Sequence, residues 1–218
     1  MLRGRRLVVF DFDGTLFDVS DAICHGFNEA LRRRGRAPLP RERIHAWIGR
    51  PLIEMFALED PAASDDVLRA SVETYREVFH PIAVGLSRAL PGLRECLDEL
   101  GSTHRFAIVT NRARRGAKDI LVGHGLLDRF DPILGIDDVQ RVKPHPEPVL
   151  AAMRHAGAGP DETVMVGDTA DDIRAGLAAG TAAVGVTTGF TPREALAAAG
   201  AHAVIASLAE LPALLKPR

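Results

Sequence analysis

The sequence predicts an α/β protein, in which helices flank a parallel sheet and a helical segment is inserted near the start. Short apolar runs rich in Val, Ile and Phe alternate along the chain with longer segments of helical period. That alternation is typical of a parallel sheet with helices on both faces. Residues 11–105 separate the first two runs, far more than one crossover helix needs, which indicates an insertion.

The expected strands follow one another with helical segments between them. In chain order they are Leu7–Phe10, 106–109, 133–136, 164–166, Ala182–Val186 and Ala203–Ile205. Amphipathic patterns such as Leu93–Leu100 and 149–156 supply the helices that cover the sheet.

The inserted segment has a helical pattern. Residues 18–80 contain apolar stripes of helical spacing at 19–31, 44–48 and 68–79, with no convincing strand. These three helices can form a small bundle. We assign residues 1–17 and 86–218 to the α/β core and residues 18–85 to the helical insertion, with the connection back to the core within 81–92.

Size and composition favour a folded protein that acts on a small molecule. The 218 residues are 46% hydrophobic and 26% charged, close to the averages for globular proteins. A net charge of −2 supplies no broad positive field for nucleic acid or an anionic membrane. No apolar stretch approaches the roughly 20 residues of a membrane helix, so we expect a cytoplasmic location. Cys24 and Cys96 match no metal-ligand spacing and should be reduced thiols.

Reactive residues follow the expected strands, at the edge where open parallel sheets bind ligands. They are Asp11 and Asp13 after the first strand, Thr110 and Asn111 after the second, Lys143 beyond the third, and Asp168 and Asp172 after the fourth. At about 4 Å and an effective dielectric near 20, each pair of like charges costs on the order of 4 kcal/mol, so these acids need a cation. Because no His or Cys cluster accompanies them, Mg²⁺ suits the site better than zinc.

These residues together predict chemistry on a phosphate ester. With Mg²⁺ balancing two charges, the pocket can admit a phosphate dianion, helped by Lys143, Thr110 and amides at helix starts. The Asp11 carboxylate can displace the alcohol from phosphorus, while Asp13 protonates the departing oxygen and later activates water. Their i, i+2 spacing points both side chains the same way in an extended segment.

Each feature alone also has an ordinary structural explanation. Asp13 before Gly14 is a turn signal. Asp168 and the pair Thr110-Asn111 are of types that often cap helices, and Lys143 could be one solvated charge among many. Their joint placement at several strand ends favours an active site.

Four segments carry a family resemblance: DFDGTLFD at 11–18, TN at 110–111, KPHPEP at 143–148 and GDTADD at 167–172. In this order they resemble the haloacid dehalogenase (HAD) superfamily, in particular its phosphoglycolate phosphatase-like branch with a small helical (C1-type) cap. The resemblance spans nearly the whole chain. It implies a Rossmann-like, HAD-like core, with the insertion as a mobile cap that closes over the substrate.

The resemblance implies roles for the four acids. Asp11 would be the nucleophile and a Mg²⁺ ligand. Asp13 would be the general acid/base and would bind Mg²⁺ through its backbone carbonyl. Asp168 would be a direct Mg²⁺ ligand, and Asp172 would act on the metal directly or through water.

It also implies how the substrate is held. Thr110, Asn111 and Lys143 would bind the phosphoryl group, Asn111 through its backbone N–H. In the cap, Gly49 and Arg50 occupy a loop that could face the substrate, where Arg50 could grip a carboxylate or second phosphate. A turn joining two helices, with a solvated Arg50, explains this loop equally well.

We therefore expect a Mg²⁺-dependent phosphatase that hydrolyses a small phosphorylated metabolite through an aspartyl phosphate, with 2-phosphoglycolate as the candidate substrate. A phosphomutase of the β-phosphoglucomutase type and a pyrophosphatase are alternatives. Family dehalogenases lack an acid at the position of Asp13, and residues 18–80 contain no Lys for a phosphonatase-type cap. A receiver-like signalling module is disfavoured because receivers have no insertion after the first strand. The protein should be a monomer or a homodimer.

Overall fold

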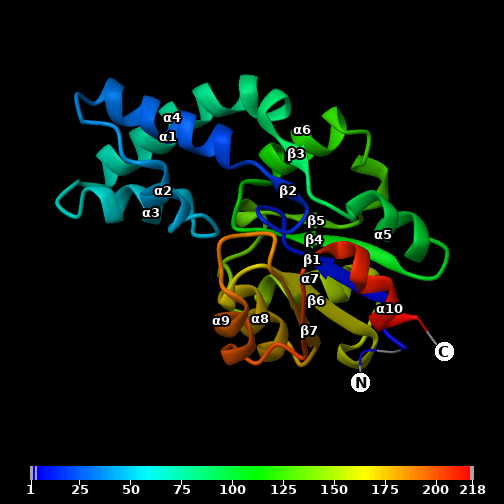
Figure 1. Ribbon diagram of the computed structural model, residues 1–218. Coiled ribbons are helices and arrows are strands. Elements are labelled where there is room, and N and C mark those ends of the chain that lie inside the picture. The colour runs from blue at the N-terminus through cyan, green and yellow to red at the C-terminus, as the bar shows by residue number, and fades with distance from the viewer. Residues whose placement is uncertain (1, 3, 217–218) are drawn as a thin grey trace.

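The core of the protein is a parallel sheet. The computed structural model describes residue 2 and residues 4–216, and within them this sheet has six strands in the order β5-β4-β1-β6-β7-β8 (Figure 1). In chain order the strands are β1 (Leu7–Phe10), β4 (Arg105–Val109), β5 (Ile133–Leu134), β6 (Thr163–Gly167), β7 (Ala182–Val186) and β8 (Ala203–Ile205). The predicted α/β fold class is confirmed.

The third strand is shorter than the expected 133–136. Residues Ile136–Asp138 form a 3-10 helix, η2, instead. The Gly135 amide donates a hydrogen bond to the Asp138 carboxylate at 2.9 Å. This local side-chain contact begins the helix and ends the strand before its apolar run is complete.

Helices cover both faces of the sheet, because side chains alternate along each strand. Leu7 and Val9 of β1 lie in an apolar cluster with α7 and α8, whereas Val8 and Phe10 lie in a larger cluster with α5, α6 and α10. The helices of the core are α5 (Leu93–Leu100), α6 (Arg114–Gly123), α7 (Glu147–Ala156), α8 (Ala170–Ala178), α9 (Arg193–Ala198) and α10 (Leu211–Leu215), with 3-10 helices η1 (Leu127–Arg129), η3 (Pro160–Glu162) and η4 (Leu208–Glu210). Each fully buried side chain of this kind contributes about 1.5–3 kcal/mol.

The strand order reverses its direction at β1. This strand pairs with β4 on one side and with β6 on the other. The chain first builds outward through β4 and β5, and then crosses over to begin β6, β7 and β8. At such a switch point the loops that follow neighbouring strands diverge and leave a crevice at their carboxyl ends, where open sheets bind ligands.

The insertion holds one helix more than expected. Within residues 18–86, all of which the structure describes, the helices are α1 (Ser20–Arg33), α2 (Arg41–His45), α3 (Leu52–Glu59) and α4 (Asp65–Leu86) (Figure 1). The predicted helix at 44–48 is wrong beyond His45, because Trp47 and Ile48 lie in a turn. Gly49 adopts a φ of +99°, which bends the chain, and α3 starts again after Pro51.

The last helix of the insertion runs through a proline. Pro81 lies inside α4, where the sequence predicts the beginning of a connection. A proline in a helix interior normally costs about 3 kcal/mol, since it removes one backbone hydrogen bond. Phe79 and Ala83, on either side of it, are both buried in the apolar core. Tertiary packing therefore holds the helix together to Leu86.

A short antiparallel ribbon joins the insertion to the core. Its strands are β2 (Phe17–Asp18) and β3 (Arg88–Ala89). Phe12, Leu16 and Phe17 belong to an apolar cluster that includes side chains of both parts. The domain limits that the sequence predicts lie beside this ribbon and stay a prediction.

Two further expectations concern the cysteines and the membrane. Cys24 and Cys96 are both free and buried, which confirms the prediction of reduced thiols. In the described part of the chain, the helices are too short or too polar to cross a bilayer.

Gly92 offers a test of how closely the core packs at the start of α5. Its φ is +81°, and an added Cβ would lie 2.3 Å from the Ala209 backbone nitrogen. Gly125 has a φ of +67° but open space around it. We expect Gly125→Ala to cost about 1–2 kcal/mol of unfolding free energy and Gly92→Ala about 1–3 kcal/mol more, from overpacking. Urea unfolding of both variants measures this; equal losses would contradict the close packing.

Candidate active site

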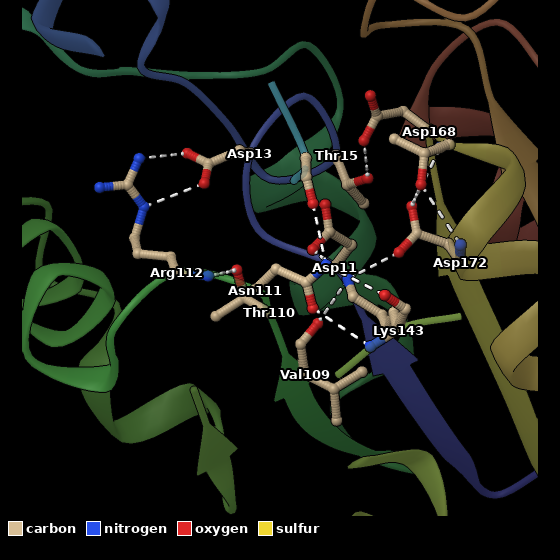
Figure 2. A network of polar contacts seen from close by, with 12 residues as sticks. Asp11, Asp13, Thr15, Val109, Thr110, Asn111, Arg112, Lys143, Asp168 and Asp172 are labelled. Atoms are coloured by element: carbon tan, nitrogen blue, oxygen red, sulfur yellow. Dashed lines mark hydrogen bonds and ion pairs between the residues drawn. The ribbon is translucent and has the colours of Figure 1, made fainter. Parts of the chain in front are cut away.

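The carboxyl ends of three adjacent strands bring the candidate residues together. Asp11 follows β1, Thr110 follows β4 and Asp168 follows β6, at the edge where the strand order reverses (Figure 2). Lys143 enters from the segment between η2 and α7, and Asp172 from the first turn of α8. All five residues are 6% exposed or less, so the sheet edge holds them in a buried pocket.

Three acids and one lysine form the centre of this pocket. One carboxylate oxygen each of Asp11, Asp168 and Asp172 lies within 4.8 Å of the other two. The Lys143 ammonium donates to Asp11 Oδ1 at 2.5 Å, to Asp172 Oδ1 at 2.6 Å and to the Val109 carbonyl at 3.0 Å (Figure 2). The alternative of a solvated Lys143 is therefore wrong, since its side chain is 3% exposed.

Burial makes negative charge costly at this place. Burial raises the pKa of Asp11 to about 7, with the Asp172 carboxylate adding to the shift and Lys143 opposing it. Burial, together with the charges of Asp11 and Asp172, raises the pKa of Asp168 well above its usual value. Burial alone would lower the pKa of Lys143, but the two carboxylates beside it outweigh burial and raise it. The pocket thus holds the positive charge of Lys143 firmly. A second positive charge would further stabilise the ionised carboxylates.

The donor set fits a hard divalent cation. Fully ionised, the acids carry −3 and Lys143 carries +1, which leaves −2. Burial, together with the neighbouring carboxylates, raises the pKa values of two of the acids, and the oxygens of the three acids lie close enough to share one ion. Oxygen ligands alone are typical of Mg²⁺ rather than of zinc. Three of the four expected metal-binding residues thus gather by their side chains.

Local structure orients the two acids that follow β6. Thr169 begins α8: its hydroxyl accepts from the Asp172 amide at 3.3 Å, and Asp172 Oδ2 accepts from the Thr169 amide at 2.9 Å. This reciprocal capping box leaves Asp172 Oδ1 for Lys143. Asp168 is therefore not the helix cap. Its carboxylate accepts instead from the Thr15 hydroxyl at 2.9 Å.

Asp13 lies outside the acid cluster. Its carboxylate makes a two-bond contact with Arg112, whose Nε and Nη2 donate at 2.9 and 2.7 Å (Figure 2). The Arg112 side chain is 9% exposed and lies 4.5 Å from the centre of the Phe79 ring in the cap. Sequence reasoning missed Arg112, although it directly follows Thr110-Asn111. The resemblance implies that Asp13 binds the metal through its backbone carbonyl, and this role stays a prediction.

The side chain of Asn111 ties three segments together. Its Oδ1 accepts from the Lys143 amide at 3.2 Å, and its Nδ2 donates to the carbonyls of Lys143 at 3.3 Å and Gly49 at 2.9 Å. The Thr110 hydroxyl accepts from the Arg112 amide at 3.2 Å. Asn111 thus positions the backbone of Lys143, whose ammonium contacts the acids. Asn111 also contacts the cap through Gly49.

The two cap candidates differ in their position. Gly49 lies against the core through its contact with Asn111, whereas Arg50 is exposed. Both line a cavity of about 590 Å³ between the cap and the core, which Asp13, Asn111 and Arg112 also line. The expected substrate-facing loop therefore borders a cavity next to the catalytic candidates.

The loop after β7 completes the pocket, and sequence reasoning missed it. The Thr188 hydroxyl donates to the Gly14 carbonyl at 2.7 Å. A Cβ on Gly189 would lie 1.8 Å from Asp168 Oδ2, so only glycine permits this approach. The rule that ligands bind after strand ends would have found Thr188, because β7 pairs directly with β6.

Comparisons with known proteins identify the family of this chain. The model of the family "Haloacid dehalogenase-like hydrolase" matches residues 8–186. The protein named "Probable phosphatase IndB" from Dickeya dadantii is 39% identical over 212 residues, which cover 94% of this chain and 91% of that one. Pyrophosphatase PpaX of Bacillus pumilus is 35% identical, covering 87% of this chain and 86% of its own.

Two further relatives complete the comparison. Phosphoglycolate phosphatase of Nitrosospira multiformis is 30% identical, with 97% of this chain and 96% of its own covered. The crystal structure of a hydrolase from Pseudomonas syringae superimposes with a TM-score of 0.84 at 29% identity, covering 96% of this chain and 97% of that one. The chain therefore belongs to the haloacid dehalogenase-like hydrolase family, and it is a phosphatase that resembles the phosphoglycolate phosphatases of that family.

Proposed function

We propose that the protein is a Mg²⁺-dependent phosphatase that hydrolyses a small phosphorylated metabolite, with Asp11 as its nucleophile. The observation that carries the proposal is the buried Asp11 carboxylate, which contacts Lys143 at 2.5 Å and shares a cluster with two further acids. Asp13 follows two residues later and lines the adjacent cavity. This arrangement supplies a nucleophile, charge for a phosphoryl group and a separate acid/base.

In the first step, an Asp11 oxygen forms a bond to phosphorus while the bond from phosphorus to the ester oxygen breaks. The departing oxygen takes a proton from Asp13, and an aspartyl phosphate remains. In this structure the Asp13 carboxylate contacts Arg112, so its side chain must leave that contact to reach the leaving oxygen. Lys143 and Thr110 bind the phosphoryl oxygens, aided by the Asn111 backbone N–H.

In the second step, Asp13 takes a proton from water, and the water oxygen bonds to phosphorus. The bond between Asp11 and phosphorus then breaks, which releases inorganic phosphate and restores the carboxylate. Mg²⁺ bound by Asp11 and Asp168, with Asp172 acting directly or through water, would supply positive charge beside the phosphoryl oxygens. Lys143 neutralises part of the negative charge throughout.

The insertion, residues 18–85, acts as a lid in this proposal. Three contacts support the role: Gly49 with Asn111 at 2.9 Å, the stacked rings of His45 and Phe190 at 4.3 Å, and Arg112 over the Phe79 ring. Together they hold the cap against the core and exclude water from the pocket. The cytoplasmic location and the monomeric or homodimeric state stay predictions.

The names of the relatives supply two candidate substrates. Phosphoglycolate phosphatases at 30% identity suggest 2-phosphoglycolate, and PpaX pyrophosphatases at 35% identity suggest pyrophosphate. For either one, Arg50 at the cavity is the cap residue that could reach a second negative charge. Both remain candidates, and a phosphomutase shares the same core residues.

The nucleophile can be tested with two neutral substitutions. We expect Asp11→Asn to lower kcat by about 10⁴-fold or more, because the amide cannot attack phosphorus while its volume is unchanged. Asp171→Asn is the control, since the Asp171 side chain on α8 is 42% exposed and pairs with Arg174 rather than with the cluster. The measurement is phosphate release from a phosphate monoester in both variants. Turnover retained by Asp11→Asn would contradict the assignment.

The metal can be tested through stability as well as activity. We expect EDTA to abolish turnover and Mg²⁺ to restore it. At 100 times its Kd, Mg²⁺ should stabilise the fold by about 2.7 kcal/mol, which raises Tm by roughly 5–10 °C for a chain of this size. Asp168→Asn should remove most of this rise and Asp171→Asn should keep it. Full activity and an unchanged Tm in EDTA would count against the metal.

Phosphatase and phosphomutase activities differ in the fate of the phosphoryl group. A phosphatase releases one inorganic phosphate for each molecule of dephosphorylated product, because water attacks the aspartyl phosphate. We therefore expect equal amounts of both products with a sugar monophosphate or 2-phosphoglycolate. Turnover of a sugar phosphate to an isomeric sugar phosphate, without free phosphate, would identify a mutase instead.

A further inference from the structure

The cavity beside the catalytic pocket is formed by both parts of the protein. Helices α1, α3 and α4 of the cap and α6 and η2 of the core border it, and its volume is about 590 Å³. Pockets of this size accept molecules well beyond a few atoms. Its dimensions therefore bear on which phosphate esters the enzyme takes.

The position of Asp13 indicates which part of the substrate lies in the cavity. Asp13 and Asn111 line the cavity, whereas Asp11, Asp168 and Lys143 are not among its lining residues. In the proposed mechanism Asp13 protonates the leaving oxygen, so it must contact the leaving alcohol. The cavity is therefore the site of the alcohol and not of the phosphoryl group. This step rests on the proposed function.

The walls of the cavity are mainly apolar. They include aliphatic and aromatic side chains from three cap helices and the turn between them, such as Ile23, Ile48, Leu52, Met55, Val72 and Phe79. Tyr75 and Phe79 stack on each other at 5.2 Å, which adds a flat aromatic surface. Such walls gain free energy by contact with an apolar or ring-bearing group rather than with a carboxylate.

The arginines of the cavity give little support to a second anion next to the phosphoryl group. Arg50 lines the cavity but is exposed to solvent, where an ion pair contributes at most about 1 kcal/mol. Arg112 is the arginine nearest Asp13, and two of its nitrogens donate to that carboxylate. Arg69 and Arg76 have side chains that are 67% and 42% exposed and pair with Asp65 and Glu73. A carboxylate on a short leaving group would therefore meet apolar walls, at the cost of its hydration.

Size leads to the same conclusion. Glycolate would fill roughly 150 Å³ if each of its non-hydrogen atoms took about the volume of a water molecule in the liquid. That is about a quarter of the 590 Å³ available. A small leaving group would leave most of the apolar wall in contact with water, and so would use little of the binding energy that the cavity can supply.

We propose that the substrates are phosphate monoesters of bulky, ring-bearing and largely apolar alcohols, rather than 2-phosphoglycolate or pyrophosphate. The ring of the alcohol lies between α3 and α4 of the cap and α6 of the core. Hydrolysis cleaves the bond between phosphorus and the ester oxygen; water supplies the oxygen that phosphorus gains and the proton that the alcohol gains. The cap thus selects the alcohol, while the core binds the phosphoryl group that all substrates share.

A series of phosphate esters with similar leaving groups tests the proposal. Ethyl phosphate, 2-phenylethyl phosphate and 2-(1-naphthyl)ethyl phosphate all release a primary alkoxide, so differences in kcat/KM report contacts with the ring. We expect kcat/KM to rise along the series by about 100-fold in total, and the naphthyl ester to exceed 2-phosphoglycolate and pyrophosphate. A flat series, or higher kcat/KM for either of the two small anions, would overturn the proposal.

Paired variants on the same helices show whether the cavity causes the preference. Ile53 and Leu58 are both exposed on α3, but only Ile53 lines the cavity. Ile53→Ser should reduce the naphthyl-to-ethyl ratio of kcat/KM about 10-fold, mainly through KM, and Leu58→Ser should leave this ratio unchanged. Val72→Trp, which fills the cavity from α4, should reduce the ratio further, with Val67→Trp as its control. Equal ratios in all four variants would contradict the assignment.

The failure of this inference is distinguishable from failure of the proposed function. If phosphate is released from the small anions in an Asp11-dependent way but the ring-bearing esters are poorer substrates, only the inference falls. If none of the five compounds is hydrolysed by the Mg²⁺-loaded enzyme, the phosphatase proposal fails and the inference fails with it.

Discussion

The geometry of the candidate active site depends on the contact of Lys143 with buried carboxylates. Three acids converge where the strand order reverses, and a single ammonium bonded to two of them at 2.5 and 2.6 Å offsets part of their charge. In a buried setting, removing one partner of such a contact leaves an unpaired charge, which typically costs 3–5 kcal/mol. Much of the surrounding structure orients these groups: the capping box turns Asp172 toward Lys143, Thr15 holds Asp168, and Asn111 holds the lysine backbone.

The remaining negative charge explains why a site of this kind suits both a cation and a phosphate. The protein alone leaves Asp11 with a pKa near 7, which shows how costly its ionised form is among its neighbours. A divalent ion removes that cost and at the same time attracts the phosphoryl oxygens. In the proposed reaction, the charge imbalance that makes the site unfavourable by itself would favour binding of a divalent cation together with a phosphate.

Asp13 marks the division between the two parts of the molecule. Asp11 faces the acid cluster, whereas Asp13, two residues later, faces Arg112 and the cavity beneath the cap. In the proposed mechanism, the chemical groups common to all substrates are therefore held at the strand ends of the core. In the proposed mechanism, the groups that distinguish one substrate from another meet α1, α3 and α4, which line the cavity. Specificity can then vary in the cap without a change to the catalytic residues.

The sequence by itself determined the fold class, the presence of six core strands and the gathering of Asp11, Asp168 and Asp172 at the strand ends, because strand periodicity and the placement of acids after apolar runs are local properties. It did not determine where helices in the cap would break: Trp47 continues a helical stripe but lies in a turn, and Pro81 should end a helix but does not. Those outcomes depend on packing against distant residues. The pairing of Asp13 with Arg112, which are far apart along the chain, and the cavity next to them exist only once the cap lies on the core, so tertiary structure alone decided them.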